Sequence, residues 1–250
     1  MRKPQDLVHS RTRVTSRYAI MPLEGFPISR LPACPGADVR VLASPALGAE
    51  FVQMLIDLPK DKIFRTTPGE GIEIFYFVLS GTGNLREGQT SRALEGGAFG
   101  LLPPGVPFEI KSAEAIRILL LQKKYQPTPG QPIFTALHGH ESKIEKKVWA
   151  DNPHSLLQTL IPDEIGFDLA MNIFTFDPGF GLPIVETHVM EHGLLFLQGK
   201  GLYYLGDRWM EVEKDDFIWM GPYCPQSFYA TGPTPSRYIY YKNINREIPL

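Results

Sequence analysis

The sequence predicts an all-β protein in which two barrel-like domains follow one another along the chain. The 250 residues include 23 glycines and 23 prolines, as expected for short strands joined by turns. The apolar stretches are short and alternate with polar hairpins. The two halves of the chain also carry the same pattern of residues at one constant spacing, which indicates a duplicated structural unit.

The internal repeat is clearest at its glycines. Gly81-Thr-Gly83 recurs as Gly199-Lys-Gly201, 118 residues later. A register that holds without a gap over more than thirty residues is difficult to obtain by chance. The same shift superposes a set of turn and strand residues in the first half, Glu73, Gly88, Glu95, Phe99, Pro104 and Pro107, on Glu191, Gly206, Glu213, Phe217, Pro222 and Pro225.

Each copy of the repeat reads as an apolar strand, a Gly-x-Gly turn, a polar hairpin and a second apolar strand that ends in prolines. The first strand is Ile74–Leu79 in one copy and Leu194–Leu197 in the other. The second strand is Phe99–Leu102 and Phe217–Met220. Many short strands separated by Gly and Pro favour an antiparallel barrel or jelly roll over a parallel α/β sheet.

The segment Gly48–Leu58 fits either a strand or a helical turn, and its counterpart one repeat later decides between them. That counterpart, Gly166–Phe176, reads as a strand, so we expect strands in both places, with Phe167–Phe176 opening the second barrel. Just before it, Ser155–Ile161 is predicted to form a short helix or bend.

The segment Lys123–Lys147 has the composition of a linker. It contains several prolines and Gly130, followed by the polar stretch His138–Lys147. The sequence therefore predicts three parts: residues 1–130 as the first barrel with an N-terminal arm, residues 131–155 as the linker, and residues 156–250 as the second barrel.

Composition and charge exclude several classes of partner. The net charge of −2 and pI near 6.3 give no basic surface for nucleic acid or an anionic membrane. No apolar run approaches the roughly 18–20 residues that span a membrane, and no apolar stretch follows the basic start, as a signal peptide would require. Cys34 and Cys224 do not make a disulfide framework. We expect a cytoplasmic protein with a small-molecule ligand.

Four residues of the second half form a candidate metal site: Glu186, His188, His192 and Gln226. Side chains repeat on one face of a strand every two residues, which places Glu186 and His188 together. His192 can rejoin them from the next stretch, and Gln226 from a distant strand folded back beside them. Two histidines and a carboxylate within seven residues indicate a metal-binding barrel interior.

Three further candidates are not counted as metal ligands. Glu191 lies among the ligands, but its repeat counterpart Glu73 occurs where no metal is predicted, so Glu191 is expected to face away from the ligands. His138-Gly-His140 resembles a chelating pair but falls in the predicted linker, so we interpret it as solvated surface. Cys224 lies two residues before Gln226, and the intervening Pro225 interrupts the alternation that would bring it to the site.

These motifs resemble a bicupin, a protein of two tandem cupin jelly-roll β-barrels. A typical cupin has His-x-His and then Glu in its first motif and a His in its second; here Glu186-x-His188, His192 and Gln226 take those places. This pattern resembles the (S)-ureidoglycine aminohydrolases. The likeness extends through the segments around Gly166-Phe-Asp168, Glu186-Thr-His-Val-Met-Glu-His-Gly193, Gly199-Lys-Gly-Leu-Tyr203, Trp209, Ile218-Trp-Met-Gly-Pro222, Ser236-Arg-Tyr238-Ile-Tyr-Tyr-Lys242-Asn-Ile-Asn-Arg246, and in the first half Leu42-Ala-Ser-Pro45-Ala-Leu-Gly48-Ala and Gly71-Ile-Glu73.

The resemblance implies hydrolysis of (S)-ureidoglycine to (S)-ureidoglycolate and ammonia with Mn(II), although Fe(II), Co(II), Ni(II) or Zn(II) also suit the ligand set. Lys242, Tyr238 and Tyr203 match active-site positions of the family. Tyr238, Tyr240 and Lys242 alternate onto one face of the last strand. We expect Lys242 to pair with the substrate carboxylate or to transfer protons at the reacting nitrogen.

The repeat shift tests the first barrel for a metal site of its own. The four ligand positions map back to Pro68, Glu70, Ile74 and Phe108, and one carboxylate does not make a site. The first barrel is therefore predicted to be free of metal, with structural or oligomeric duties. We expect a homo-oligomer, the usual form of soluble enzymes.

Two other functional classes stay open at this point. One is an Fe(II) dioxygenase or decarboxylase acting on a small carboxylic acid, because cupins host many reactions. The Gln ligand and the Tyr238/Lys242 tail argue against it. The other is a storage or binding bicupin, but storage cupins usually lose their ligands, whereas this chain keeps four.

Overall fold

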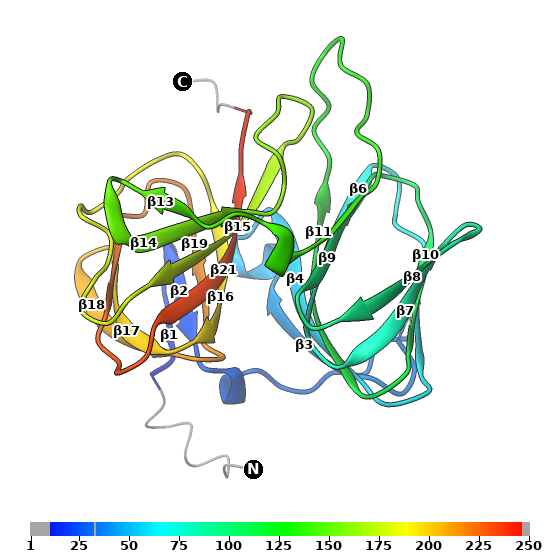
Figure 1. Cartoon of the computed structure of the whole chain (residues 1–250), viewed down its shortest axis with the longest axis horizontal. Helices are drawn as coiled ribbons and strands as arrows, with labels where there is room; N and C mark the ends of the chain where they lie inside the picture. The colour runs from blue at the N-terminus through cyan, green and yellow to red at the C-terminus, as the bar shows by residue number, and fades with distance from the viewer. Residues whose placement is uncertain (1–10, 33, 247–250) are drawn as a thin grey trace. The chain divides into compact units, whose positions relative to one another are not determined.

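The computed structural model describes residues 11–32 and 34–246 (Figure 1). These residues divide into two compact units, one formed by residues 27–143 and the other by the chain up to Phe26 together with the chain from Ile144 onward. The predicted all-β fold class is confirmed. The helical segments of the described residues are three 3-10 turns: Leu23–Gly25, Pro45–Leu47 and Glu141–Lys143.

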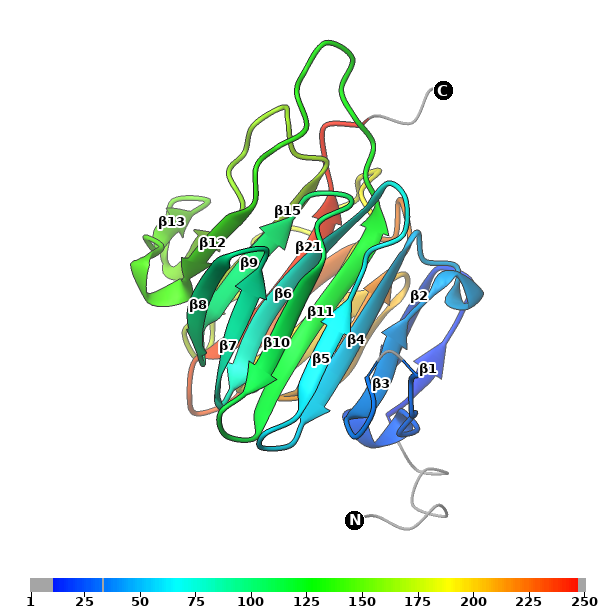
Figure 2. The ribbon, with the colours of Figure 1, turned by 90° about the vertical axis from the view of Figure 1, so that its right-hand side faces the viewer.

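The first barrel is built from two antiparallel sheets, whose strands face the viewer in Figure 2. Their strand orders are β12-β9-β6-β11-β4-β3 and β5-β10-β7-β8. The strands are β3 (Asp38–Ala43), β4 (Phe51–Leu58), β5 (Ile63–Thr66), β6 (Ile72–Ser80), β7 (Thr82–Glu87), β8 (Thr90–Glu95), β9 (Ala98–Leu102), β10 (Phe108–Ser112), β11 (Ile116–Lys124) and β12 (Leu137–His140).

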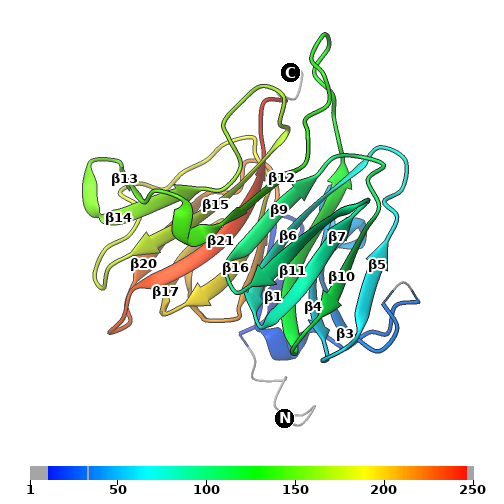
Figure 3. The same ribbon diagram turned by 45° about the vertical axis from the view of Figure 1, so that its right-hand side comes forward.

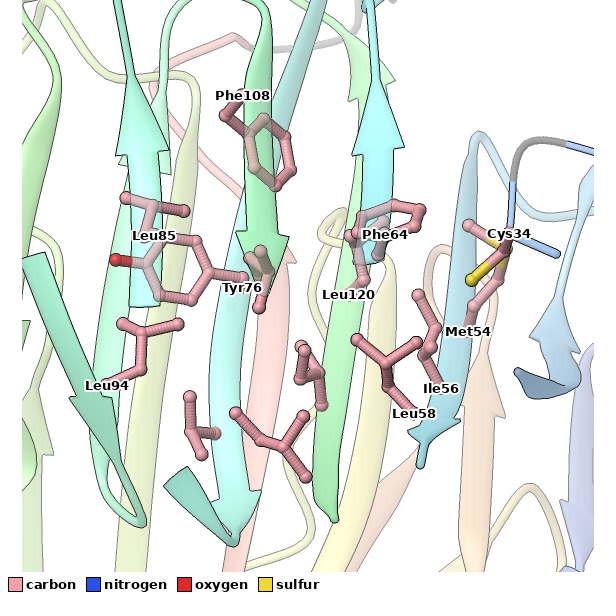
Figure 4. Packing of buried hydrophobic residues seen from close by; sticks show 14 of the residues in the cluster. Cys34, Met54, Ile56, Leu58, Phe64, Tyr76, Leu85, Leu94, Phe108 and Leu120 are labelled. Atoms are coloured by element: carbon pink, nitrogen blue, oxygen red, sulfur yellow. The ribbon is translucent and has the colours of Figure 1, made fainter. Parts of the chain in front are cut away.

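The interior of the first barrel is filled by side chains from both sheets (Figure 4). Alternate residues of β6 point inward, as the strand period requires, and Ile74 and Tyr76 are almost completely buried. Phe108 packs edge-on against Phe64, with ring centroids 5.9 Å apart. Glu70 is exposed to solvent. Two of the four positions that correspond to the candidate ligands are therefore occupied by core residues, Ile74 and Phe108.

The second barrel repeats this plan with sheets of order β1-β2-β19-β16-β21-β15-β14-β13 and β18-β17-β20. Its strands are β1 (Arg13–Val14), β2 (Tyr18–Met21), β13 (Lys147–Trp149), β14 (Asn152–Thr159), β15 (Leu169–Phe176), β16 (His192–Gln198), β17 (Lys200–Leu205), β18 (Arg208–Glu213), β19 (Phe217–Met220), β20 (Gln226–Ala230) and β21 (Ser236–Asn243).

The sequence repeat corresponds to a structural repeat. Strands β4, β8 and β10 recur as β15, β18 and β20 with both ends shifted by the same 118 residues that relate the two sequence copies. The strand preferred for Gly48–Leu58 is confirmed, since β4 occupies Phe51–Leu58 and pairs with β11 and β3. The duplicated pattern thus sets the same strand order in both barrels.

The prediction of a helix or bend at Ser155–Ile161 was wrong. Most of this segment lies in β14, which pairs with β15 from Ser155↔Phe176 to Thr159↔Asn172. Pairing with a long neighbouring strand satisfies the backbone groups of β14, and this tertiary effect outweighs the local propensity that suggested a bend.

The interpretation of His138 and His140 as solvated linker residues was also wrong. Both belong to β12, which pairs with β9 at the sheet edge (Figure 3). The His138 ring lies between the hydroxyl of Tyr76 and the carboxylate of Glu87, at 3.0 Å from each. Gly139 lies against the ring of Phe99, where a Cβ would come within 2.5 Å of a ring carbon. The predicted linker therefore contributes a strand to the first barrel.

The N-terminal arm belongs to the second barrel, which differs from the predicted boundaries. Strand β2 pairs with β19 from Tyr18↔Met220 to Met21↔Phe217. Arg11 forms an ion pair with the buried Asp216. In each barrel the strand beside the second apolar strand thus comes from outside the repeat: β2 precedes both copies, and β12 follows the first.

Candidate metal centre and active site

The segment from Gly181 to Glu191 carries two of the four candidate ligands on a loop that is tied to β20. Glu186 and Gln226 exchange backbone hydrogen bonds of 2.8 and 2.9 Å. The backbone of Tyr223 donates to the carbonyl of His188 at 2.7 Å. The expected regular strand through Glu186 and His188 is therefore replaced by a loop fixed at single points, and His192 follows as the first residue of β16.

Three of the four candidate ligands meet at one point. The Nε2 atoms of His188 and His192 lie 3.3 Å apart. The Gln226 amide nitrogen lies 3.1 Å from Nε2 of His188 and 3.0 Å from Nε2 of His192. Nitrogen ligands about 2.1 Å from one metal in neighbouring coordination positions would be about 3 Å apart, so this spacing suits a shared ion.

Hydrogen bonds orient two of these groups. Nδ1 of His192 lies 3.1 Å from the carbonyl oxygen of Tyr241, to which it donates, so Nε2 presents its lone pair to the site. The Tyr203 hydroxyl donates to Oε1 of Gln226 at 3.1 Å, and Tyr238 in turn donates to Tyr203. A chain of two buried phenols thus fixes the Gln226 amide.

A cavity of about 260 Å³ opens at this point inside the second barrel. All seven residues proposed from the sequence line it: Glu186, His188, His192, Gln226, Lys242, Tyr238 and Tyr203. Most of the other lining side chains are apolar, which is typical of small-molecule sites with a few placed polar groups. They include Trp149, Leu157, Ile161, Ala170, Phe174, Leu182, Leu194, Met220 and Ile244.

Strand register places the residues of the last strand in the cavity wall. On β21, Lys242 lies between Ala170 of β15 and His192 of β16. Two residues earlier, Tyr240 lies between Asn172 and Leu194. The next residue on the same face is Tyr238. The predicted alternation of Tyr238, Tyr240 and Lys242 onto one face is confirmed, because all three line the cavity.

The electrostatics of the cavity keep its histidines neutral. Burial lowers the pKa of His192 to about 3, and the neighbouring His188 and Lys242 act in the same direction. Burial and then Lys242 also lower the pKa of His188. Burial raises the pKa of Glu186, whereas the Lys242 ammonium opposes this rise. Neutral imidazoles carry the lone pairs that a metal requires.

The two tyrosines are neutral donors rather than bases. Burial is the main cause that raises the pKa of Tyr203 and of Tyr238, far above any ordinary working pH. The negative charge of Glu186 raises both further. Their hydroxyls can therefore orient Gln226 or bind a ligand, but they do not accept protons as phenolates.

Glu186 stands slightly apart from the other three ligands. In the part of the chain that the structure describes, no three His, Cys, Asp or Glu side chains lie close enough to hold a metal by themselves. The Glu186 carboxylate lines the same cavity, and its charge acts on Lys242 and the buried tyrosines. The donor set of two neutral imidazoles, an amide and a nearby carboxylate fits a divalent ion without thiolate ligands.

Glu191 and Cys224, neither of which was counted as a ligand from the sequence, are both buried. The Glu191 carboxylate is almost completely buried and accepts the indole N–H of Trp219 at 2.8 Å, so its structural role is confirmed. Cys224 is buried and packs with the core of the barrel, and it is not among the lining residues of the cavity.

Asn172 lines the cavity but was not selected from the sequence. It lies on β15, is 4% exposed and donates from Nδ2 to the Tyr240 hydroxyl at 3.2 Å. Its amide oxygen has no hydrogen-bond partner among the described residues. Strand alternation along Leu169–Phe176 predicts that Asn172 and Phe174 share a face. It does not predict that this face borders a cavity, because the cavity is formed by strands distant in the sequence.

Two tandem jelly-roll barrels, of which the second holds a His/His/Gln cavity with an adjacent carboxylate, define a bicupin with a candidate metal centre. Comparison with curated proteins identifies the family. The chain is 34% identical to (S)-ureidoglycine aminohydrolase from Escherichia coli (strain K12), covering 98% of this chain and 96% of that protein. It is 30% identical to the Arabidopsis thaliana enzyme of the same name, over 97% and 81%. The chain belongs to the (S)-ureidoglycine aminohydrolase family, as predicted.

Comparison with solved structures agrees with this family assignment. The Ylba protein from E. coli has a TM-score of 0.87 and 32% identity over the full length of both chains. A putative glyoxylate-induced protein from Pseudomonas aeruginosa has a TM-score of 0.88 and 30% identity, covering 97% and 94%. Oxalate decarboxylase from Bacillus subtilis, at 10% identity and a TM-score of 0.73, shares the fold alone.

No family model matches the chain. Among the described residues, the structure contains no helix with the length and apolar character needed to cross a membrane.

Proposed function

We propose that this protein hydrolyses (S)-ureidoglycine to (S)-ureidoglycolate and ammonia in purine (allantoin) degradation, and that the cavity of the second barrel is its active site. The observation that carries the proposal is the convergence of His188, His192 and Gln226 in a cavity that Lys242 also lines. Relatives named for this reaction, matching nearly the whole chain, support it.

We further propose that Glu186, His188, His192 and Gln226 hold Mn(II). In the structure the Gln226 amide nitrogen faces the imidazoles and its oxygen accepts from Tyr203. A rotation of the amide by about 180° exchanges the two atoms, so that the oxygen faces an ion and the nitrogen donates to the phenol oxygen. A bound divalent ion would supply positive charge and open coordination positions for the substrate carboxylate and a neighbouring donor, which would select one enantiomer.

For this reaction the protein mainly has to orient the substrate and transfer protons. The central carbon of the substrate carries an amine and a ureido nitrogen, so it expels ammonia readily. The carbon–amine bond breaks with a proton added to the leaving nitrogen, and water then adds its oxygen to that carbon and releases a proton. The chain's residues hold one enantiomer and deliver the proton, so that water enters at one face.

Lys242 is the side chain proposed to assist departure of the amine or to pair with the carboxylate. The strand register sets it beside His192, and its charge acts on Glu186. Tyr203 and Tyr238 stay neutral, and the Tyr203 hydroxyl is the hydrogen-bond partner that orients the Gln226 amide. With both phenols neutral, Lys242 is the better proton carrier of the three.

The test is ammonia release from freshly generated ureidoglycine, with metal-stripped protein before and after addition of Mn(II), while the chirality of the product is followed. We expect faster release and accumulation of (S)-ureidoglycolate only with metal. A folded, metal-loaded protein that gives no acceleration over spontaneous decay would reject the proposal. Oxygen uptake by the iron-loaded protein would point to a dioxygenase instead.

A further inference from the structure

The cavity wall contains one polar pair that neither the metal centre nor Lys242 uses. Asn172 on β15 and Tyr240 on β21 are directly paired across the two strands. Nδ2 of Asn172 donates to the Tyr240 hydroxyl at 3.2 Å. The Asn172 amide oxygen has no hydrogen-bond partner in the described residues, although the side chain is almost completely buried.

A buried amide oxygen without a partner is costly, because it has lost its hydrogen bonds to water and gained none in return. Asn172 and Tyr240 both line the cavity, so a bound molecule can supply the missing donor. The Tyr240 oxygen already accepts from Asn172, which leaves the hydroxyl hydrogen free to be donated. The pair thus offers one acceptor and one donor side by side, without charge.

We propose that Asn172 and Tyr240 bind the carbamoyl end of the substrate's ureido group. The Asn172 amide oxygen accepts an N–H from the terminal –NH₂, and the Tyr240 hydroxyl donates to the ureido carbonyl oxygen. This inference rests on the proposed function, since it assigns the part of ureidoglycine that is not expected to contact the metal.

The position of the pair along the barrel fits this assignment. Tyr240 lies two residues from Lys242 on the same strand and face, a separation of roughly 6–7 Å. The charged end of a small ureido acid can therefore reach the region of Lys242 and His192 while its neutral end reaches Asn172. The ring of Tyr240 stacks on Phe174 with centroids 5.5 Å apart, which holds the hydroxyl in place.

The chemistry of the pair predicts selectivity. A neutral acceptor beside a phenol matches a carbamoyl group, which has both an N–H donor and a C=O acceptor. An acetyl group would instead place a methyl group against the Asn172 oxygen. Sites built to hydrogen-bond a polar group reject analogues that lack it, because the buried partner is then left unpaired.

The experiment compares two probes that cannot release ammonia. N-Carbamoylglycine keeps the carboxylate and the ureido group, and N-acetylglycine replaces the terminal –NH₂ with a methyl. Calorimetric titration of the full-length protein in Mn(II)-containing buffer should show a preference of about fivefold or more for N-carbamoylglycine. Equal affinity for the two probes, or no measurable binding of N-carbamoylglycine, would overturn the inference.

Variants of Asn172 and Tyr240 test which side chain causes the preference for N-carbamoylglycine. Asn172→Leu removes the amide at similar volume and should abolish the preference, with Asn172→Ala as a second variant if leucine prevents folding. Tyr240→Phe should weaken both probes equally, because both keep the carbonyl oxygen. The matched control is Thr175→Val, which changes another buried side chain of β15 that has no hydrogen-bond partner among the described residues and does not line the cavity. A preference that survives in both Asn172 variants would contradict the role of Asn172.

The test of ureido recognition and the test of the proposed reaction can fail independently. Failure of the wild-type protein to release ammonia from ureidoglycine, together with a probe preference that depends on Asn172, would reject the reaction and support ureido recognition. Ammonia release with no such preference would support the reaction and reject ureido recognition. In an active enzyme, Asn172→Leu should raise KM for ureidoglycine, and Thr175→Val should not.

Discussion

In the proposed metal centre, the side-chain amide of Gln226 must be held in one orientation for its oxygen to face the ion. It contacts both imidazoles on one side and the Tyr203 hydroxyl on the other, and Tyr203 is itself held by Tyr238. Groups that orient a metal ligand from behind commonly contribute as much to affinity as a weak ligand does. The proposed metal centre therefore depends on a buried phenol that is not itself a proposed ligand.

Replacing Tyr203 with phenylalanine should weaken Mn(II) binding by about tenfold, because the Gln226 amide loses the partner that fixes it. The measurement is a metal titration of the stripped protein. Tyr204→Phe is the matched control, since Tyr204 is the next residue on β17 and packs against Trp209 instead of lining the cavity. Equal Mn(II) affinity in the two variants would contradict the role given to Tyr203.

Lys242→Met should lower kcat for ammonia release by about a hundredfold or more, because the variant lacks the proton carrier or carboxylate partner. Its metal content should equal that of the wild type, since Lys242 is not a proposed ligand. The control is Lys214→Met, which removes an exposed lysine of the same barrel. An unchanged rate in Lys242→Met would exclude Lys242 from the reaction.

Among the elements, β12 is attached to the first barrel by a partly buried histidine, His138. His138 connects Tyr76 of β6 to Glu87 of β7, and it lies opposite Gly100 of β9. A Cβ at Gly100 would come within 2.6 Å of the Tyr76 ring and 2.8 Å of the His138 ring. The absence of a side chain on β9 is therefore what lets the histidine reach the phenol.

This contact predicts a pH dependence of stability. Burial is the main cause that lowers the pKa of His138 below its ordinary value of 6.5, and Arg92 adds to it against the opposing Glu87. The unfolded chain then binds more protons than the folded one as pH falls below 6.5. The stability that comes from the neutral imidazole is thus present above pH 6.5 and is lost as pH falls toward the folded-state pKa.

Denaturant titrations between pH 7.5 and pH 5.5 check this prediction. The wild type should lose more free energy of unfolding over this range than His138→Gln, which keeps polar atoms but does not titrate. The histidines of the metal centre are common to both proteins, so their contribution cancels in the comparison. Parallel losses in the two proteins would show that His138 does not contribute.

At the scale of the whole molecule, one duplicated pattern produces two interiors with different contents. The first barrel is filled by apolar side chains such as Ile74 and Phe108, and the second keeps His192 and Gln226 at the corresponding positions. We therefore expect one equivalent of Mn(II) per chain by metal analysis. Glu70→Gln should not change this value, whereas His188→Ala should reduce it strongly. Two equivalents per chain, or metal loss in Glu70→Gln, would contradict this assignment.

Much of the fold could be predicted from the sequence, because its signals are local. Glycines and prolines mark turns wherever they occur, and a constant shift between two copies transfers the structure of one to the other, as it did for Phe51–Leu58. The prediction for Ser155–Ile161 failed because the strand there is stabilised by pairing with β15, whereas its local residues suit a bend equally well. The prediction for His138 failed because the composition of the surrounding segment suggested a linker.

The duplicated all-β architecture and the residue types of the candidate metal centre can be predicted from the chain alone, because spacing and side-chain chemistry are local properties of the sequence. The pairing of β2 with β19 and the position of Asn172 beside Tyr240 in the cavity wall become visible only in the folded protein. Both depend on strands far apart in the sequence. Packing and strand register across the whole barrel determine which strand occupies a sheet edge. They also determine which neutral side chain is left with an unpaired oxygen.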